Sequence, residues 1–264
     1  MKEEETHHQF SQLHGSFGSR IRKRAGTHAG IVFLMERSVS EVIQVQNLSH
    51  FYGPRLVFRG VSFAVHPGEV ILVTGPNGSG KTTLLKILAA LLKPSSGLVS
   101  HGLDKDQIGY MGHQSFVYPL LTARENLLFW ARLYGRASGD AAIQEALQRV
   151  GLGAVQHERA GHFSRGMEQR LSLARLLCLA PELYLLDEPA TGLDSASREI
   201  LHAEIGPARL NGKTVLWISH SQDQDCRRAD RMLCLDGKAA EMTDLAGDSA
   251  SWADDRNQPG ASLS

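Results

Sequence analysis

The chain has 264 residues, is 42% hydrophobic, and balances 28 Lys and Arg against 28 Asp and Glu. This composition is globular, and the length allows one large or two small domains. The zero net charge argues against a nucleic acid as partner, because domains that bind its phosphates carry a basic excess. No apolar run approaches the ~18 residues of a membrane-spanning helix, so we expect no transmembrane segment.

The two ends of the chain differ from its middle. Residues 1–39 mix His, Ser and Gly with a basic cluster and lack periodicity, so we expect a flexible N-terminal extension, with Met35 as a candidate start. Residues 247–264 are rich in Ser, Asp and Gly and are expected to form a disordered tail. The acidic start does not resemble a secretory signal, and the three cysteines form no CxxC pair, so we expect the cytosol.

Between these ends, strand patterns alternate with helix patterns. A Thr122–Glu125 capping box opens one of the helices. Pro94 and Gly97 are expected to end another. In chain order we expect strands over 41–48, 56–65 and 70–74, a helix over 81–92, helices over 123–134, 140–150 and 167–179, a strand over 183–187, a helix over 195–204, a strand over 214–218, a helix over 221–229 and a strand over 231–235.

This alternation predicts an α/β fold with a parallel-sheet core, interrupted by a helical insert at about residues 115–165. The sequence contains no internal repeat.

A glycine-rich segment, Gly75-Pro-Asn-Gly-Ser-Gly-Lys81-Thr82, fits GxxxxGK[ST] at every fixed position and lies between a strand and a helix. Its glycines allow backbone N–H groups to surround a phosphate, and the helix N-terminus adds positive partial charge. Lys81 would bridge the β- and γ-phosphates, and the Thr82 hydroxyl would ligate Mg²⁺. The alternative is a loop that only joins a strand to a helix, but the context favours nucleotide binding.

The apolar strand that begins at Leu183 ends in two carboxylates, Asp187 and Glu188. Ligands bind at the carboxyl ends of parallel strands. Asp187 therefore suits a contact to Mg²⁺ from behind the ion's direct ligands, and Glu188 suits orienting and deprotonating the attacking water. Without the phosphate loop, two solvated acids at a strand end would be an equally good interpretation.

With these motifs in place, four further segments make the chain resemble the nucleotide-binding subunit of ABC transporters over about residues 41–240. They are Gln114, Phe163–Met167, Gly192–Asp194 and His220. The resemblance implies a P-loop NTPase (ABC ATPase) fold over 40–246, with a parallel-sheet core, an antiparallel β subdomain and the helical insert.

The same resemblance implies a role for each site residue. Glu188 and His220 would be catalytic, and Thr82, Gln114 and Asp187 would serve the Mg²⁺ ion. Tyr52 would stack on adenine. The residues implied in ATP binding are Tyr52, Gly75, Pro76, Asn77, Gly78, Ser79, Gly80, Lys81, Thr82, Thr83, Ser164, Gly166 and Asp194.

Each of these residues has a simpler interpretation when it is considered alone. Gln114 could be a polar loop residue, His220 a satisfied histidine and Tyr52 a core aromatic. Asp194 and Ser164 could each be an ordinary helix N-cap. Their joint order along the chain favours the family role.

The signature segment departs from the family's LSGGQ pattern. Phe163, Arg165 and Met167 replace Leu, the third-position Gly and Gln, whereas Ser164 and Gly166 are retained. A hydroxyl and a backbone N–H at a helix N-terminus remain, so anion binding is physically possible. The role of Arg165 stays open.

The departure also suggests a branch of the family. The segments Phe163–Leu171 and Thr122–Asn126 resemble the ATP-binding subunit of the haem exporter of cytochrome c biogenesis. Export ATPases for lipids, drugs or polysaccharides are the alternative. Less favoured are a soluble ABC-type ATPase acting on ribosomes or DNA, which would need a second domain or long insertions, and a regulatory module without turnover.

The resemblance also implies partners. Two ATPase subunits would enclose two ATP molecules head to tail, and their closing would move integral membrane permease subunits from the cytoplasmic face of the inner membrane. The segment Phe116–Leu121 could dock a partner helix or could pack in the core.

Overall fold

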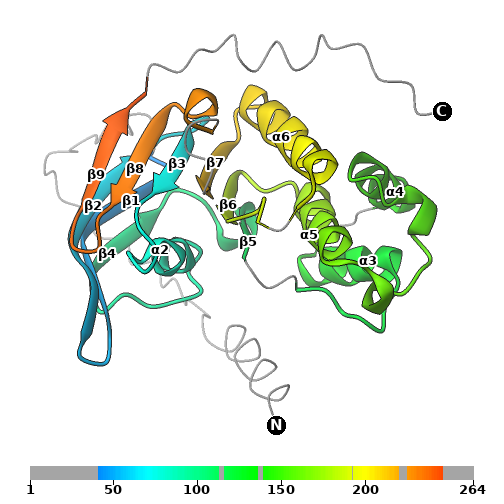
Figure 1. The fold of residues 1–264 in the computed structure, drawn as a ribbon, viewed down its shortest axis with the longest axis horizontal. Coiled ribbons are helices and arrows are strands. Elements are labelled where there is room, and N and C mark those ends of the chain that lie inside the picture. Colours follow the sequence, from blue (N-terminus) through cyan, green and yellow to red (C-terminus); the bar gives the residue numbers. More distant parts are fainter. Residues whose placement is uncertain (1–40, 113–115, 136–138, 192, 220–224, 246–264) are drawn as a thin grey trace, which may run out of the picture. The chain divides into compact units, whose positions relative to one another are not determined.

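The computed structural model describes residues 41–112, 116–135, 139–191, 193–219 and 225–245 (Figure 1). The expected N-terminal extension and C-terminal tail lie outside these residues. In the described part, no helix combines the length and the apolar character needed to cross a membrane.

The larger sheet has six strands in the order β5-β6-β7-β3-β8-β9. Its first five strands are parallel, and β9 is antiparallel to β8. The strands are β3 (Val70–Thr74), β5 (Ile108–Met111), β6 (Leu183–Asp187), β7 (Thr214–Ile218), β8 (Arg231–Leu235) and β9 (Ala240–Asp244). The predicted parallel-sheet core is confirmed.

A second sheet has three antiparallel strands in the order β2-β1-β4. They are β1 (Ile43–Tyr52), β2 (Arg55–Val65) and β4 (Ser96–His101). The pairing of β1 shifts register between Val45 and Phe51, and Asn47 within this stretch has a left-handed φ of 47°. This sheet is the antiparallel β subdomain that the resemblance to ABC ATPases predicts.

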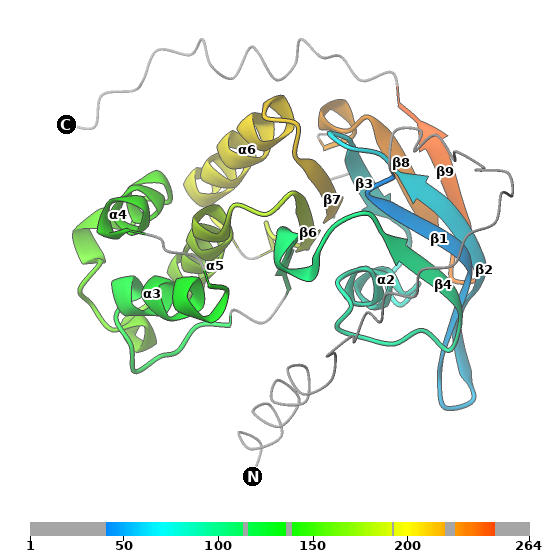
Figure 2. The same ribbon diagram turned by 180° about the vertical axis from the view of Figure 1, so that it is seen from behind.

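Side chains on the two faces of the parallel sheet enter two different cores, because successive strand residues point to opposite faces. Ile71 and Val73 pack with the three-stranded sheet and with α2 (Lys81–Leu88). Val70 and Leu72 pack on the other side, with helices. These helices are α3 (Ala123–Leu133), α4 (Asp140–Arg149), α5 (Arg165–Leu179) and α6 (Ser195–Leu210), and Figure 2 shows them gathered away from the three-stranded sheet.

The helix predicted over 81–92 is shorter than expected, because α2 ends at Leu88. Ala90 takes a left-handed φ of 56°, and the N–H of Leu91 bonds to the carbonyl of Lys86, while that of Ala90 bonds to the carbonyl of Ile87. This pair of bonds is a Schellman motif with alanine in the position that glycine usually takes. Pro94 therefore does not end the helix.

The other helix boundaries also differ from the expected ones. The predicted capping box is confirmed, since the Thr122 hydroxyl accepts from the Glu125 N–H and the Glu125 carboxylate accepts from the Thr122 N–H. α5 begins two residues early, at Arg165, and α6 continues to Leu210, through Gly206 and Pro207. Of the helix predicted over 221–229, the described residues include a 3₁₀ turn at Cys226–Arg228.

Three strands, β4, β5 and β9, have no counterpart among the predicted elements. β4 is largely exposed and contains Gly97, and β9 is an edge strand with exposed Glu241, Thr243 and Asp244. β4 lacks the apolar alternation on which strand prediction relies, and in β9 the alternation covers only the first four residues. β5 spans only Ile108–Met111, too few residues to show a period.

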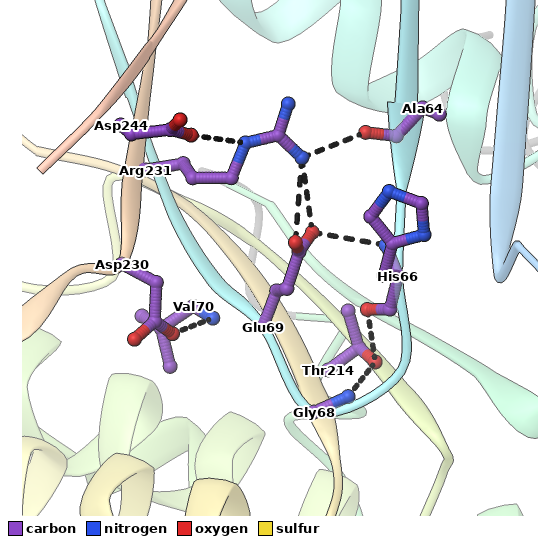
Figure 3. A network of polar contacts seen from close by, with 9 residues as sticks. All are labelled: Ala64, His66, Gly68, Glu69, Val70, Thr214, Asp230, Arg231 and Asp244. Atoms are coloured by element: carbon purple, nitrogen blue, oxygen red, sulfur yellow. Dashed lines mark hydrogen bonds and ion pairs between the residues drawn. The ribbon is translucent and has the colours of Figure 1, made fainter.

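One arginine at the start of β8 links the two sheets (Figure 3). The phosphate loop follows the other end of the neighbouring parallel strand, β3. Arg231 Nη1 donates to the Ala64 carbonyl at 3.1 Å and to Glu69 Oε2 at 3.2 Å, and its Nε lies 3.3 Å from Asp244 Oδ1. Glu69 Oε2 also accepts from the His66 N–H at 2.9 Å. The last residues of β2, the turn before β3 and the end of β9 are thus held by a single guanidinium.

Candidate nucleotide-binding site

The phosphate loop connects β3 to α2 and requires glycine at two positions. Gly75 has φ 132° and Gly80 has φ 101°, a region that side chains rarely adopt. A Cβ on Gly75 would lie 2.0 Å from the Leu235 carbonyl oxygen, and one on Gly80 would lie 2.5 Å from Val57 Cγ1. Gly80 also leaves the start of α2 without a side-chain cap, so its first N–H groups are available to an anion.

A pocket of about 260 Å³ opens beside this loop. It brings together segments that are far apart in the sequence. Its lining residues are Tyr52, Arg55, Val57, Asn77, Gly78, Gly80, Lys81, Thr82, Thr83 and Glu188. Tyr52 is 53% exposed, which excludes the alternative that it is a core residue, and its hydroxyl lies 3.5 Å from the Thr83 hydroxyl.

Lys81 places a buried positive charge in the pocket. Its ammonium donates to the carbonyls of Gly75 at 2.8 Å and Pro76 at 3.1 Å. The hydroxyl of Ser79 is buried in the same loop and has no hydrogen-bond partner in the described part of the chain. The loop therefore holds a cation, open helix N–H groups and an unused hydroxyl, which is the donor set of a phosphate site.

Asp187, the last residue of β6, is 2% exposed and lies opposite the start of α2. Its Oδ1 accepts from the Thr82 hydroxyl at 2.9 Å, and its Oδ2 accepts from the Tyr110 hydroxyl at 3.2 Å. Burial raises the pKa of Asp187, and these two hydrogen bonds oppose that shift. Hydroxyl and carboxylate oxygens at this separation suit Mg²⁺, which prefers oxygen ligands.

Glu188 follows at the carboxyl edge of the sheet and lines the pocket. Its backbone has a left-handed φ of 53°, rare for a residue with a side chain, and its Oε2 accepts from the Thr191 hydroxyl at 3.3 Å. Strain of this kind persists where the surrounding structure fixes it, often at functional sites. The arrangement presents a carboxylate next to the loop that would hold the phosphates.

Three predicted ATP-contact residues lie outside both this pocket and the phosphate loop. Ser164 caps α5 by accepting from the Met167 N–H at 3.3 Å, and Asp194 caps α6 by accepting from the Ser197 N–H at 2.7 Å. Hydrogen bonds from the Ser197 hydroxyl and from the Ser197 N–H lower the pKa of Asp194. Gly166 lies in the first turn of α5. None of the three lines the pocket, so a single chain does not bring them to Lys81.

Two predicted site residues, Gln114 and His220, lie outside the described residues, as does Gly192, and their roles stay predictions. Conversely, the structure adds residues to the site that no motif identified. Arg55 and Val57 line the pocket from β2, and Tyr110 reaches Asp187 from β5. Arg55 could have been suspected, because it lies three residues after the predicted site residue Tyr52. No sequence signal identifies Tyr110, because its contact with Asp187 joins two neighbouring strands that are far apart in the chain.

A sequence model of the family described as "ABC transporter" matches residues 58–191, a segment that contains the phosphate loop and the two carboxylates. This chain belongs to the ABC transporter family. As an ABC ATPase it binds ATP, and it hydrolyses ATP in a reaction coupled to transport.

Several curated ABC relatives are similar along much of the chain. The cytochrome c biogenesis ATP-binding export protein CcmA of Mesorhizobium japonicum is 45% identical over 159 residues, which are 58% of this chain and 78% of that protein. CcmA of Paramagnetospirillum magneticum is 38% identical over 67% of this chain and 86% of its own. The linearmycin resistance ATP-binding protein LnrL of Bacillus subtilis is 32% identical over 74% of this chain and 66% of its own.

Solved ABC structures share the fold. The ATP-binding cassette MJ0796, in a dimeric post-hydrolysis state bound to ADP and Pi, superposes with a TM-score of 0.69 at 28% identity and covers 78% of this chain and 99% of its own. An ATP-binding subunit of an ABC transporter gives a TM-score of 0.71 at 26% identity, over 82% of this chain and 95% of its own.

Proposed function

We propose that this ABC ATPase drives haem export for the biogenesis of c-type cytochromes, by working as a head-to-tail dimer on integral membrane permease subunits at the cytoplasmic face of the inner membrane. The observation that carries the ATPase part is the pocket in which Lys81, Thr82 and Glu188 meet at the carboxyl edge of the parallel sheet. The haem branch rests on the CcmA relatives, at 38–45% identity.

The geometry of the pocket supports a separate role in ATP binding or hydrolysis for each of these residues. Tyr52, exposed at the pocket's mouth, offers its ring to the adenine. Lys81 would exchange the carbonyls of Gly75 and Pro76 for phosphate oxygens. Thr82 and Asp187 would hold Mg²⁺, which when bound neutralises charge on the β- and γ-phosphates. Glu188 would orient and deprotonate the attacking water.

The dimer is supported by the position of Gly166. A Cβ there would meet no atom of the described residues closer than 3.9 Å, and its φ lies outside the left-handed region. The fold itself therefore does not require glycine in this first turn of α5. A close approach from outside, by the γ-phosphate bound to a second subunit, explains a residue without a side chain beside Ser164.

The helical insert offers a surface for permease subunits. Leu120 is 79% exposed, and Tyr118, Phe129 and Leu133 are also exposed around it. Phe116 and Val117, in contrast, are partly buried. Within the segment Phe116–Leu121, the first residues pack in the core, whereas Leu120 is exposed and could dock a partner helix.

Export of another substrate is the second candidate. LnrL aligns with 74% of this chain, more than the 58% of the first CcmA relative, although at lower identity. Deletion of the gene, followed by haem staining of membrane c-type cytochromes, separates the two. Loss of these cytochromes, restored by the wild-type chain but not by Lys81→Ala, is the expected result. Normal cytochromes would refute haem export and leave the ABC assignment intact.

Purification from membranes tests whether integral membrane permease subunits are the partners of this chain. We expect the chain to fractionate with membranes only when its integral membrane subunits are co-expressed, and those subunits to co-purify with it. A chain that fractionates with ribosomes instead would favour a soluble ABC-type ATPase.

A further inference from the structure

Tyr110 contacts the metal-site carboxylate without belonging to any of the sequence motifs. It lies on β5, directly opposite Leu185 of β6, two residues before Asp187. Its hydroxyl donates to Asp187 Oδ2 at 3.2 Å, while the Thr82 hydroxyl donates to Oδ1 at 2.9 Å. Each oxygen of this buried carboxylate thus accepts a bond from a different hydroxyl.

Tyr110 is itself held in place. Arg175 of α5, 7% exposed, donates from Nη2 to the Tyr110 carbonyl at 3.0 Å, and its guanidinium lies 4.9 Å from the ring centre of Trp130. A Cβ on Gly112 would lie 2.7 Å from both Cε1 and the hydroxyl oxygen of Tyr110. The missing side chain at Gly112 therefore leaves the space that the tyrosine ring occupies.

We propose that Tyr110 is a positioning residue of the magnesium–nucleotide site, which fixes the Asp187 carboxylate by a second hydrogen bond so that Oδ1 faces Thr82. The inference rests on the proposed Mg²⁺ site at Thr82 and Asp187. One hydrogen bond leaves a carboxylate free to turn about its last side-chain bond, whereas two bonds to opposite oxygens define its plane. Groups that orient a metal ligand are worth roughly 10–100-fold in metal affinity.

The test is Tyr110→Phe, which removes the hydroxyl and keeps the ring. The measured quantity is the affinity for a fluorescent ADP analogue, with Mg²⁺ and with EDTA, and the ratio of the two affinities. We expect the EDTA affinity to stay at the wild-type value and the ratio to fall about tenfold. Tyr184→Phe is the matched control, because Tyr184 is a buried tyrosine on the neighbouring strand whose ring packs in the other core, away from Asp187.

Gly112→Ala provides a second, independent variant, because it displaces the ring while the hydroxyl remains. It should lower the same ratio, and it serves if Tyr110→Phe fails to fold. A wild-type ratio in Tyr110→Phe, or an equal fall in Tyr184→Phe, overturns the role of Tyr110.

Asp187→Asn distinguishes an error in the role of Tyr110 from an error in the proposed Mg²⁺ site at Thr82 and Asp187. If Asp187→Asn loses the Mg²⁺ effect and Tyr110→Phe keeps it, the metal site stands and only the role of Tyr110 is wrong. If Asp187→Asn also keeps the effect, the Mg²⁺ site itself is misplaced and the inference falls with it.

Discussion

At the scale of single residues, the site combines groups that the fold holds in unfavourable states. Asp187 is buried as a carboxylate, and Glu188 has a left-handed backbone. Burial and the charge of Asp187 raise the pKa of Tyr110, so that this hydroxyl remains a donor. Such features lower the free energy of unfolding, and they are retained at sites where function requires them.

Glu188→Gln should abolish turnover but preserve ATP binding. An amide keeps the size of the carboxylate but cannot take a proton from water, and removing a general base lowers turnover by about 10²–10⁴-fold. We expect Glu188→Gln to remain as an ATP-bound dimer, measured by size-exclusion chromatography with light scattering at saturating ATP. Lys81→Ala, which should not bind ATP, is the control. A monomeric Glu188→Gln that hydrolyses ATP normally would contradict the assignment.

At the scale of secondary-structure elements, local sequence signals predict an element's boundary correctly where that boundary depends only on residues close by in the chain. The capping box at Thr122 depends on groups within one turn, and it is confirmed. The end of α2 depends on Ala90 adopting a left-handed conformation that the sequence favours poorly, so Pro94 gave a misleading signal. β4 and β9 depend on partners in the sheet rather than on their own pattern.

Thr122→Ala should destabilise the protein by about 1 kcal/mol, the usual effect of losing an N-cap. Bonds to the Thr122 N–H lower the pKa of Glu125, so its contribution is present above the ordinary glutamate pKa of 4.5 and is lost as the pH falls through the lowered value. Glu125→Gln keeps the Thr122 cap but removes this charge, so its difference from wild type in urea unfolding should shrink in acid. Thr243→Ala, at an exposed position of β9, should show no such pH dependence.

Arg231→Met should lower the free energy of unfolding by about 2 kcal/mol, because hydrogen bonds to charged groups contribute roughly 1.5–3 kcal/mol each. It leaves the half-buried Glu69 without its arginine. The double variant Arg231→Met/Glu69→Gln should recover part of this loss in urea unfolding, as expected for coupled residues. Additive losses would show that the two side chains act independently. ATP affinity should stay unchanged, since Glu69 directly precedes β3 and Arg231 begins β8, whereas the phosphate loop follows the end of β3.

At the scale of the whole molecule, the residues predicted to contact ATP fall into two separate groups. The pocket holds Lys81, Thr82 and Glu188, whereas Ser164 and Gly166 are at the start of α5 and do not line it. The two sets can act on one ATP if they come from different subunits. The dimeric state of MJ0796 shows that a protein of this fold assembles in pairs.

Gly166→Ala tests this arrangement, because the added methyl group meets nothing closer than 3.9 Å in the part of the chain that the structure describes. The free energy of unfolding should not fall, and ATP should still bind the monomer. Dimerisation on ATP and turnover should both drop by at least about tenfold, equivalent to roughly 1.4 kcal/mol of lost interaction. Gly139→Ala, at another open position, is the control. A variant with wild-type turnover would show that no ligand approaches Gly166 closely.

The sequence by itself determined the phosphate loop, the two carboxylates at the end of β6 and the family, because these are short motifs whose chemistry needs fixed residue types at fixed spacing. It also determined the alternation of strands and helices, through apolar periodicity. Only the tertiary structure decided which distant residues meet. Tyr110 and Asp187, Arg55 and the phosphate loop, and Arg231 and Glu69 are brought together by strand order and sheet packing. No local pattern encodes such contacts, because they depend on how the whole chain buries its apolar faces.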